Sequence, residues 1–279
     1  MKKSLLMIGA AALLSLSAAY IPGDPEATED LYINLVGDAD EAIAKGRWED
    51  AERALTDAMK LQPTNPGNIM LMSNLGIVQY NRGNDSLALA TLTRAHEMAP
   101  RSVTVLRNLA MVRTSAGDLD GALRDYETIA GLDSTDTGSR FYHAIISLRR
   151  GDMARAVGDI RWLETHAPED RETLLAQATL ASATGAYEEA VKAYTRLIKK
   201  DPQPEYYGER ALANIMTDRL GDAADDIASG LALDPQDATL YLYRAMLNKA
   251  RYRPDDARAD AEKAISLGAD REAAMSVIR

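Results

Sequence analysis

The strongest constraint on this chain is a pattern that recurs every 34 residues. It is a glycine followed five residues later by an alanine, and the glycines from Gly83 to Gly185 follow one another at intervals of 34. The five pairs are Gly46 and Ala51, Gly83 and Ala88, Gly117 and Ala122, Gly151 and Ala156, and Gly185 and Ala190. A period of this length is typical of stacked two-helix units, in which each unit buries its apolar face only against its neighbours. The chain is therefore predicted to be an all-α solenoid, an architecture that usually serves as a binding scaffold.

Residues 69–100 show how one unit is built. A break at residues 81–84 separates two helical stretches. In the second stretch Ala88, Leu92 and Ala95 fall at i, i+4 and i+7, so they share one face of a helix. The glycine in the break allows the chain to reverse, and a proline ends the unit because it cannot continue a helix.

The chain contains seven such units in register, which predicts fourteen helices. The last two units lack the turn glycine and carry Asp218 and Tyr252 in its place. The third unit has Ser134 where most units end in proline. Residues 270–279 are predicted to form a short capping helix with Asp270 as its N-cap.

These residues resemble the tetratricopeptide repeat family, and in particular its exported bacterial members. The most specific fragments are Leu75-Gly76, Gly185-Ala-Tyr-Glu-Glu-Ala190 and Leu233-Asp-Pro235, and the resemblance covers residues 32–269. It implies a right-handed superhelix of about seven antiparallel two-helix units, whose concave groove is lined by the first helix of each unit.

Carried over position by position, the resemblance implies which side chains line that groove and bind a partner. The groove residues are Ser73, Ile77, Tyr80, Arg107, Met111, Phe141, Ile145, Leu148, Leu212 and Met216. Phe141 is the only phenylalanine and is predicted to be the main anchor for a partner. The alternative is that the phase is off by one residue and these side chains belong to the core between helices.

The N-terminus has the pattern of a secretory signal. Lys2 and Lys3 precede an apolar run from Leu5 to Leu16, and small residues follow up to Ala19. The run is shorter than the ~20 residues that a membrane-spanning helix needs. Residues 1–19 are therefore predicted to be cleaved, leaving no integral membrane segment, and residues 20–31 to be a polar linker. The protein is expected to be exported, to the periplasm in a Gram-negative cell and otherwise to the medium; an uncleaved anchor is the alternative.

Composition excludes several kinds of chemistry. There is no cysteine, so disulfides, thiolate catalysis and cysteine metal sites are excluded. The formal net charge is −10 and basic residues form no run, which argues against nucleic acid as a partner. The three histidines lack a partner at i+4, and no metal, cofactor or catalytic motif is present. Acidic pairs such as Asp225-Asp226 are expected on solvated faces.

The sequence thus predicts a non-enzymatic scaffold of the cell envelope that binds a peptide or helix of a partner protein in its groove. Two alternatives stay open. The protein could be a structural rod that self-associates through its terminal repeats. It could also be an accessory subunit of an envelope export or polysaccharide system.

Overall fold

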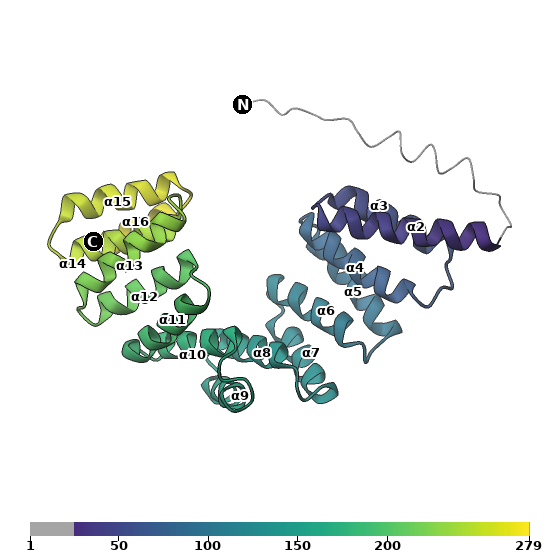
Figure 1. Cartoon of the computed structure of the whole chain (residues 1–279), viewed down its shortest axis with the longest axis horizontal. Coiled ribbons are helices and arrows are strands. Elements are labelled where there is room, and N and C mark those ends of the chain that lie inside the picture. The colour runs from purple at the N-terminus through teal and green to yellow at the C-terminus, as the bar shows by residue number, and fades with distance from the viewer. Residues whose placement is uncertain (1–24, 279) are drawn as a thin grey trace, which may run out of the picture. The chain divides into compact units, whose positions relative to one another are not determined.

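The computed structural model describes residues 25–278, and all regular structure in this part of the chain is helical (Figure 1). The predicted signal at residues 1–19 lies outside the described residues. The chain divides between Ser134 and Thr135 into two compact units, here called unit 1 and unit 2. The predicted all-α fold of consecutive two-helix units is confirmed.

Unit 1 contains three helix pairs. The helices are α2 (Pro25–Ala44), α3 (Trp48–Leu61), α4 (Asn68–Asn81), α5 (Asp85–Met98), α6 (Val103–Ser115) and α7 (Leu119–Leu132). Each first helix packs along the second helix of its own pair, and α3 and α5 also pack against the first helix of the next pair. The first helices α4 and α6 are in direct contact.

Unit 2 contains four helix pairs and one closing helix. The helices are α8 (Thr137–Arg150), α9 (Met153–His166), α10 (Arg171–Ala183), α11 (Tyr187–Lys200), α12 (Pro204–Met216), α13 (Leu220–Leu233), α14 (Ala238–Ala250), α15 (Pro254–Ser266) and α16 (Arg271–Ile278). Contacts again run from each pair to the next, and α16 packs on α14 and α15.

The tight turn inside each pair explains the 34-residue step. The five turn glycines have φ between 64° and 82°, a left-handed conformation that other residues rarely adopt. Asp218 with φ of 59° and Tyr252 with φ of 60° take the same conformation in the last two pairs. The alignment of these two residues with the turn glycines is therefore confirmed.

The repeated alanines lie at the closest helix contacts. All seven, from Ala51 to Ala257, are between 0% and 1% exposed. A methyl side chain at this position lets the second helix approach the first, and larger residues one turn later, such as Leu55, Leu92 and Tyr126, fill the space beside it.

The helices at the two ends of the described chain bear on two predicted boundaries. Helix α2 begins at Pro25, so residues 25–31 are helical and the predicted linker over residues 20–31 is wrong for this part. At the other end, the amide of Ala273 donates to Asp270 Oδ1 at 2.8 Å, which is the capping role predicted for Asp270. No helix in the described part of the chain is long and apolar enough to span a bilayer.

Candidate functional site

The first helices of unit 1 are joined by side-chain hydrogen bonds between residues about one repeat apart. They run from Tyr32 Oη to Asn68 Oδ1 (3.2 Å), from Asn108 Nδ2 to Ser73 Oγ (2.9 Å) and from Tyr80 Oη to Ser115 Oγ (3.0 Å). These bonds fix the spacing of α2, α4 and α6. The exposed side of these three helices is called the first-helix face of unit 1.

The predicted groove residues of unit 1 differ in accessibility. Ser73 is 0% exposed and its hydroxyl accepts the hydrogen bond from Asn108, so its assignment as a partner contact is corrected. Ile77 and Tyr80 are half-buried against the apolar cluster between α4, α5 and α6. Arg107 and Met111 are exposed, Met111 by 39%.

In unit 2, Phe141 is an interior residue. It is 8% exposed and packs in a core cluster with Ala144, Ile160, Leu163 and Ala176. The prediction that Phe141 is an accessible anchor is therefore wrong. Phe141 belongs to the core between helices, which was the alternative to the groove assignment. The next residue, Tyr142, lies edge-to-face on Phe141 and is 47% exposed.

The remaining predicted residues of unit 2 are at least partly accessible. Ile145 and Leu148 are half-buried against the same cluster as Phe141, and Leu212 is half-buried on α12. Met216, at the end of α12, is 51% exposed. Within unit 2 these side chains belong to the first helices α8 and α12, as predicted.

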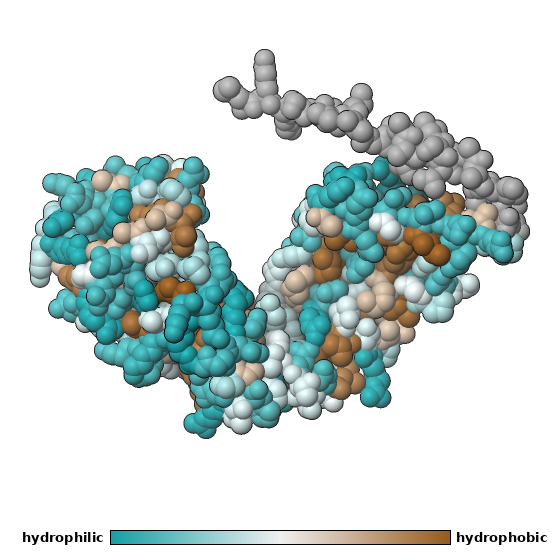
Figure 2. Space-filling model, viewed as in Figure 1, coloured by the Kyte–Doolittle hydropathy of each residue, from teal (hydrophilic) through white to brown (hydrophobic). Residues whose placement is uncertain are grey.

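Two exposed apolar residues of unit 1 escaped the sequence analysis. Ile33 on α2 is 57% exposed, and Met70 at the start of α4 is 41% exposed. With Met111 they place one accessible apolar side chain on each of the three first helices. Figure 2 shows apolar surface over the region of α2 and α4. The signal was present, because Ile33 and Met70 occupy the same position of the repeat.

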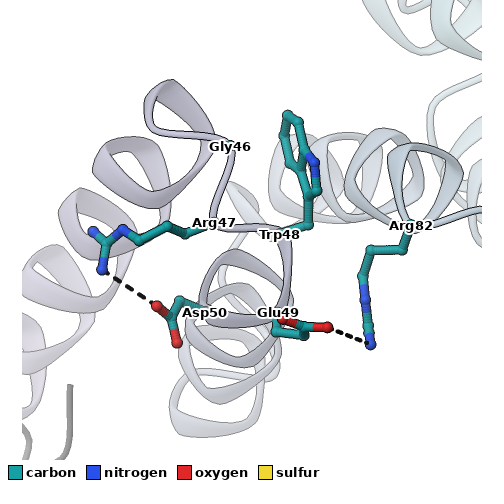
Figure 3. Close-up of a pocket in the computed structure, with 6 residues that line it drawn as sticks. All are labelled: Gly46, Arg47, Trp48, Glu49, Asp50 and Arg82. Atoms are coloured by element: carbon teal, nitrogen blue, oxygen red, sulfur yellow. Dashed lines mark hydrogen bonds and ion pairs between the residues drawn. The ribbon is translucent and has the colours of Figure 1, made fainter. Parts of the chain in front are cut away.

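A hollow of about 480 Å³ lies beside the first turn of unit 1 (Figure 3). Trp48 packs over the turn glycine, and Arg47 and Arg82 flank it. Arg47 Nη1 lies 3.2 Å from Asp50 Oδ2, and Arg82 Nη2 lies 3.6 Å from Glu49 Oε1. Because both guanidinium groups are paired with carboxylates, this hollow is a structural feature of the turn and lacks a free cation for an anionic ligand.

Four buried aspartates were missed by the sequence analysis. Asp125, Asp159, Asp226 and Asp260 each lie three residues after the repeat alanine and are 5% to 6% exposed. A regular aspartate at that spacing was the available signal. Each one accepts hydrogen bonds from an arginine on the first helix of its pair: Arg113, Arg140, Arg210 and Arg244 respectively.

One of these networks corrects the expectation for Asp226. Arg210 Nη2 donates to Asp226 Oδ1 at 2.5 Å, and Asn214 Nδ2 donates to Asp226 Oδ2 at 3.0 Å. Asp226 is therefore an interior residue, whereas Asp225 beside it is exposed. A recess of about 360 Å³ between α11, α12 and α13 is bounded by this network.

Burial raises the pKa values of several side chains in the described residues. It raises the pKa of Asp125, and the guanidinium of Arg113 acts in the opposite direction. Burial and then Glu209 raise the pKa of Tyr243 and of Tyr194. Tyr243 Oη donates to Glu209 Oε1 at 2.8 Å. Among residues 25–278 no three histidine or acidic side chains gather as metal ligands would.

The family profile and the similar proteins agree with this geometry. The tetratricopeptide repeat profile matches residues 37–103, 73–137, 143–205 and 175–238. Sperm-associated antigen 1 of Mus musculus is 33% identical over 95 residues, which are 34% of this chain and 10% of that protein. The matched segment thus spans about a tenth of that relative's length.

Two solved structures share the fold. A tetratricopeptide repeat protein from Parabacteroides merdae is 26% identical with a TM-score of 0.75, covering 89% of this chain and 98% of that chain. PilF of Pseudomonas aeruginosa is 17% identical with a TM-score of 0.61, covering 76% of this chain and 97% of that chain. The profile matches extend over more than half of the sequence and follow the observed helix pairs, so the chain belongs to the tetratricopeptide repeat family.

Proposed function

We propose that this protein is a non-enzymatic scaffold of the cell envelope that binds a peptide or helix of a partner protein on the first-helix face of unit 1. The observation that carries the proposal is the set of exposed apolar side chains on adjoining first helices in unit 1: Ile33, Met70 and Met111. Methionine side chains are flexible and polarisable, so they adapt to the contours of a bound peptide or helix.

The fold supports an interaction role in two ways. Proteins of this repeat family generally act through protein–protein contacts, and the hydrogen bonds among α2, α4 and α6 give unit 1 a preformed surface. A preformed surface lowers the ordering cost of binding. Export is part of the proposal because of the signal-like N-terminus.

A crosslinking pull-down from the envelope fraction of the source cell tests this function. Met70→Glu and Met111→Glu place a carboxylate on the first-helix face. Met98→Glu is the matched control, because Met98 is 52% exposed but lies on the second helix α5. We expect a protein captured by the parent and by the control, and lost by both face variants. Equal capture by all forms, or capture of nothing but the protein itself, would contradict the proposal.

A further inference from the structure

Helix α2 carries nearly all of the excess negative charge of unit 1. It has six acidic residues and no lysine or arginine among its 20 residues. Residues 25–134 contain seventeen acidic and ten basic residues, a difference of seven, so the rest of unit 1 is close to neutral. The charge of this unit is therefore concentrated on one first helix.

One exposed stripe runs along α2 with the spacing of a helix-packing seam. Asp30, Ile33, Gly37, Asp40 and Ala44 are all exposed and follow one another at steps of three, four, three and four residues. This alternation is the pattern by which two helices keep one side in contact along their length. The α2 stripe, as these five residues are called below, thus has the periodicity to receive another helix.

The middle of the α2 stripe is open and apolar. A Cβ atom placed on Gly37 would meet no other atom within 4 Å, and Ile33 is 57% exposed, the most of the large apolar side chains exposed in unit 1. A glycine facing open space lets the backbone of a second helix approach closely. A glycine inside a helix also weakens that helix by about 1 kcal/mol relative to alanine, and no contact within the described structure requires it at this position.

The carboxylates on the α2 stripe and next to it are available to a partner. Glu41 is paired with Lys45 and Arg47, but Asp30, Asp38 and Asp40 make no ion pair or side-chain hydrogen bond in the described part of the chain. Burial, and to a smaller extent the nearby Glu29 carboxylate, raises the pKa of Tyr32. Unpaired carboxylates repel nucleic acid and anionic lipid, and they attract basic protein segments.

We propose that the α2 stripe docks an amphipathic helix of a partner protein, with small apolar residues against Ile33 and Gly37 and with lysine or arginine beside Asp30 and Asp40. The inference rests on the proposed function and specifies the partner's chemistry at one edge of the first-helix face. A helix fits the seam spacing, and a basic one matches the unpaired carboxylates.

Fluorescence anisotropy of the full chain with two labelled helical peptides tests the charge. One probe is an 18-residue amphipathic peptide of leucine, alanine and lysine, and the other has glutamate at every lysine position. We expect the lysine peptide to bind, to weaken with added salt, and to lose about 3- to 10-fold in affinity with Asp30→Asn/Asp40→Asn. Asp85→Asn/Glu97→Gln on α5 is the matched control and should bind like the parent.

Gly37→Gln tests close approach independently of charge. The new side chain enters open space, so the variant should melt no lower than the parent but should lose at least about 10-fold in affinity for the lysine peptide. Gly131→Gln on α7 is the control, because a Cβ there also meets nothing within 4 Å. The thermal melts separate loss of binding from loss of folding.

The outcomes distinguish the two proposals. Equal binding of the lysine and glutamate peptides, or unchanged binding by Gly37→Gln, would overturn the α2 docking site. If Met70→Glu and Met111→Glu still abolish capture of the native partner, the scaffold function survives that result. If Met70→Glu and Met111→Glu still capture the native partner, both proposals fail.

Discussion

At the scale of single residues, the repeat dictates backbone geometry more strictly than side-chain identity. The turn inside each pair needs a left-handed residue, and Tyr252 occupies that place with φ of 60° although its side chain is 93% exposed. An exposed aromatic ring at such a φ contributes little packing to offset the steric cost of the backbone. The strain is therefore a local, removable feature of the last pair.

Replacing Tyr252 by glycine should stabilise the protein. We expect Tyr252→Gly to raise the free energy of unfolding by about 1 kcal/mol, because a left-handed conformation costs a bulky residue about 1–2 kcal/mol. Thermal melting followed by circular dichroism measures the change. Asp218→Gly is the control with a smaller gain, since aspartate tolerates this conformation better. A lower melting temperature for Tyr252→Gly would show that the ring makes a stabilising contact.

The fate of Phe141 shows what the sequence could and could not predict about the candidate site. Its uniqueness and its position on a first helix were readable, and both drew attention to it. Whether a side chain at that position points outward or into the core depends on small rotations between helices, which the repeat pattern does not encode. Conversely, Ile33 and Met70 share one position of the repeat, but the repeat pattern does not show that this position is exposed.

At the scale of helices, two glycines on first helices have opposite roles. Gly76 on α4 faces α5 so closely that a Cβ atom there would overlap Cγ of Leu92, whereas Gly37 on α2 faces open space. The position of Gly76 is occupied by alanine in other pairs, for example by Ala39, Ala110 and Ala144. Leu92 of α5 therefore occupies the space that a Cβ atom at Gly76 would need.

Alanine at these two glycines should change stability in opposite directions. Gly37→Ala is expected to stabilise the protein by about 1 kcal/mol through helix propensity alone. Gly76→Ala is expected to destabilise it by about 1–3 kcal/mol, because Leu92 must leave its position in a dense core. Urea unfolding of both variants measures this. Equal gains from the two would mean that Leu92 moves aside at no cost.

Removing one partner of a buried network should be more damaging. Asp226→Leu leaves the guanidinium of Arg210 and the amide of Asn214 without their acceptor, and we expect a loss of about 3 kcal/mol. The double variant Arg210→Met/Asp226→Leu removes both charges and should recover most of it. If the single variant melts like the parent, the ion pair is not part of the folded core.

At the scale of the whole molecule, the number of helix pairs and the positions of the turns could be predicted because each pair repeats the same local sequence pattern. The buried Arg–Asp networks did not, since an aspartate on a helix looks solvated until the neighbouring helix is placed. Asp226 illustrates this: it lies three residues after the repeat alanine and is buried, whereas Asp225, one residue earlier, is exposed.

Alkaline pH should destabilise unit 2. Burial raises the pKa of Tyr243 and of Tyr194 above that of an unfolded tyrosine, about 10. Their stabilising contribution is therefore fully present below pH of about 10 and is lost as the pH rises above it. Melting temperatures measured between pH 8 and pH 11 should fall, and Tyr243→Phe should fall less steeply. A Tyr243→Phe profile parallel to that of the parent would contradict this assignment.

The differing partners of the buried aspartates bear on folding fidelity. Chains of near-identical repeats risk pairing a helix with the counterpart one unit away, and misassembly of this kind is a known failure of repeat proteins. Asp159 meets Arg140 and His143, whereas Asp226 and Asp260 each meet an arginine and an asparagine at identical spacing. If α9 packed on α12, Asp159 would face an arginine and an asparagine in place of Arg140 and His143. A slip between the pairs α12/α13 and α14/α15 does not change the partners of the aspartate in this way, so mispaired species should concentrate at the C-terminal end of the chain.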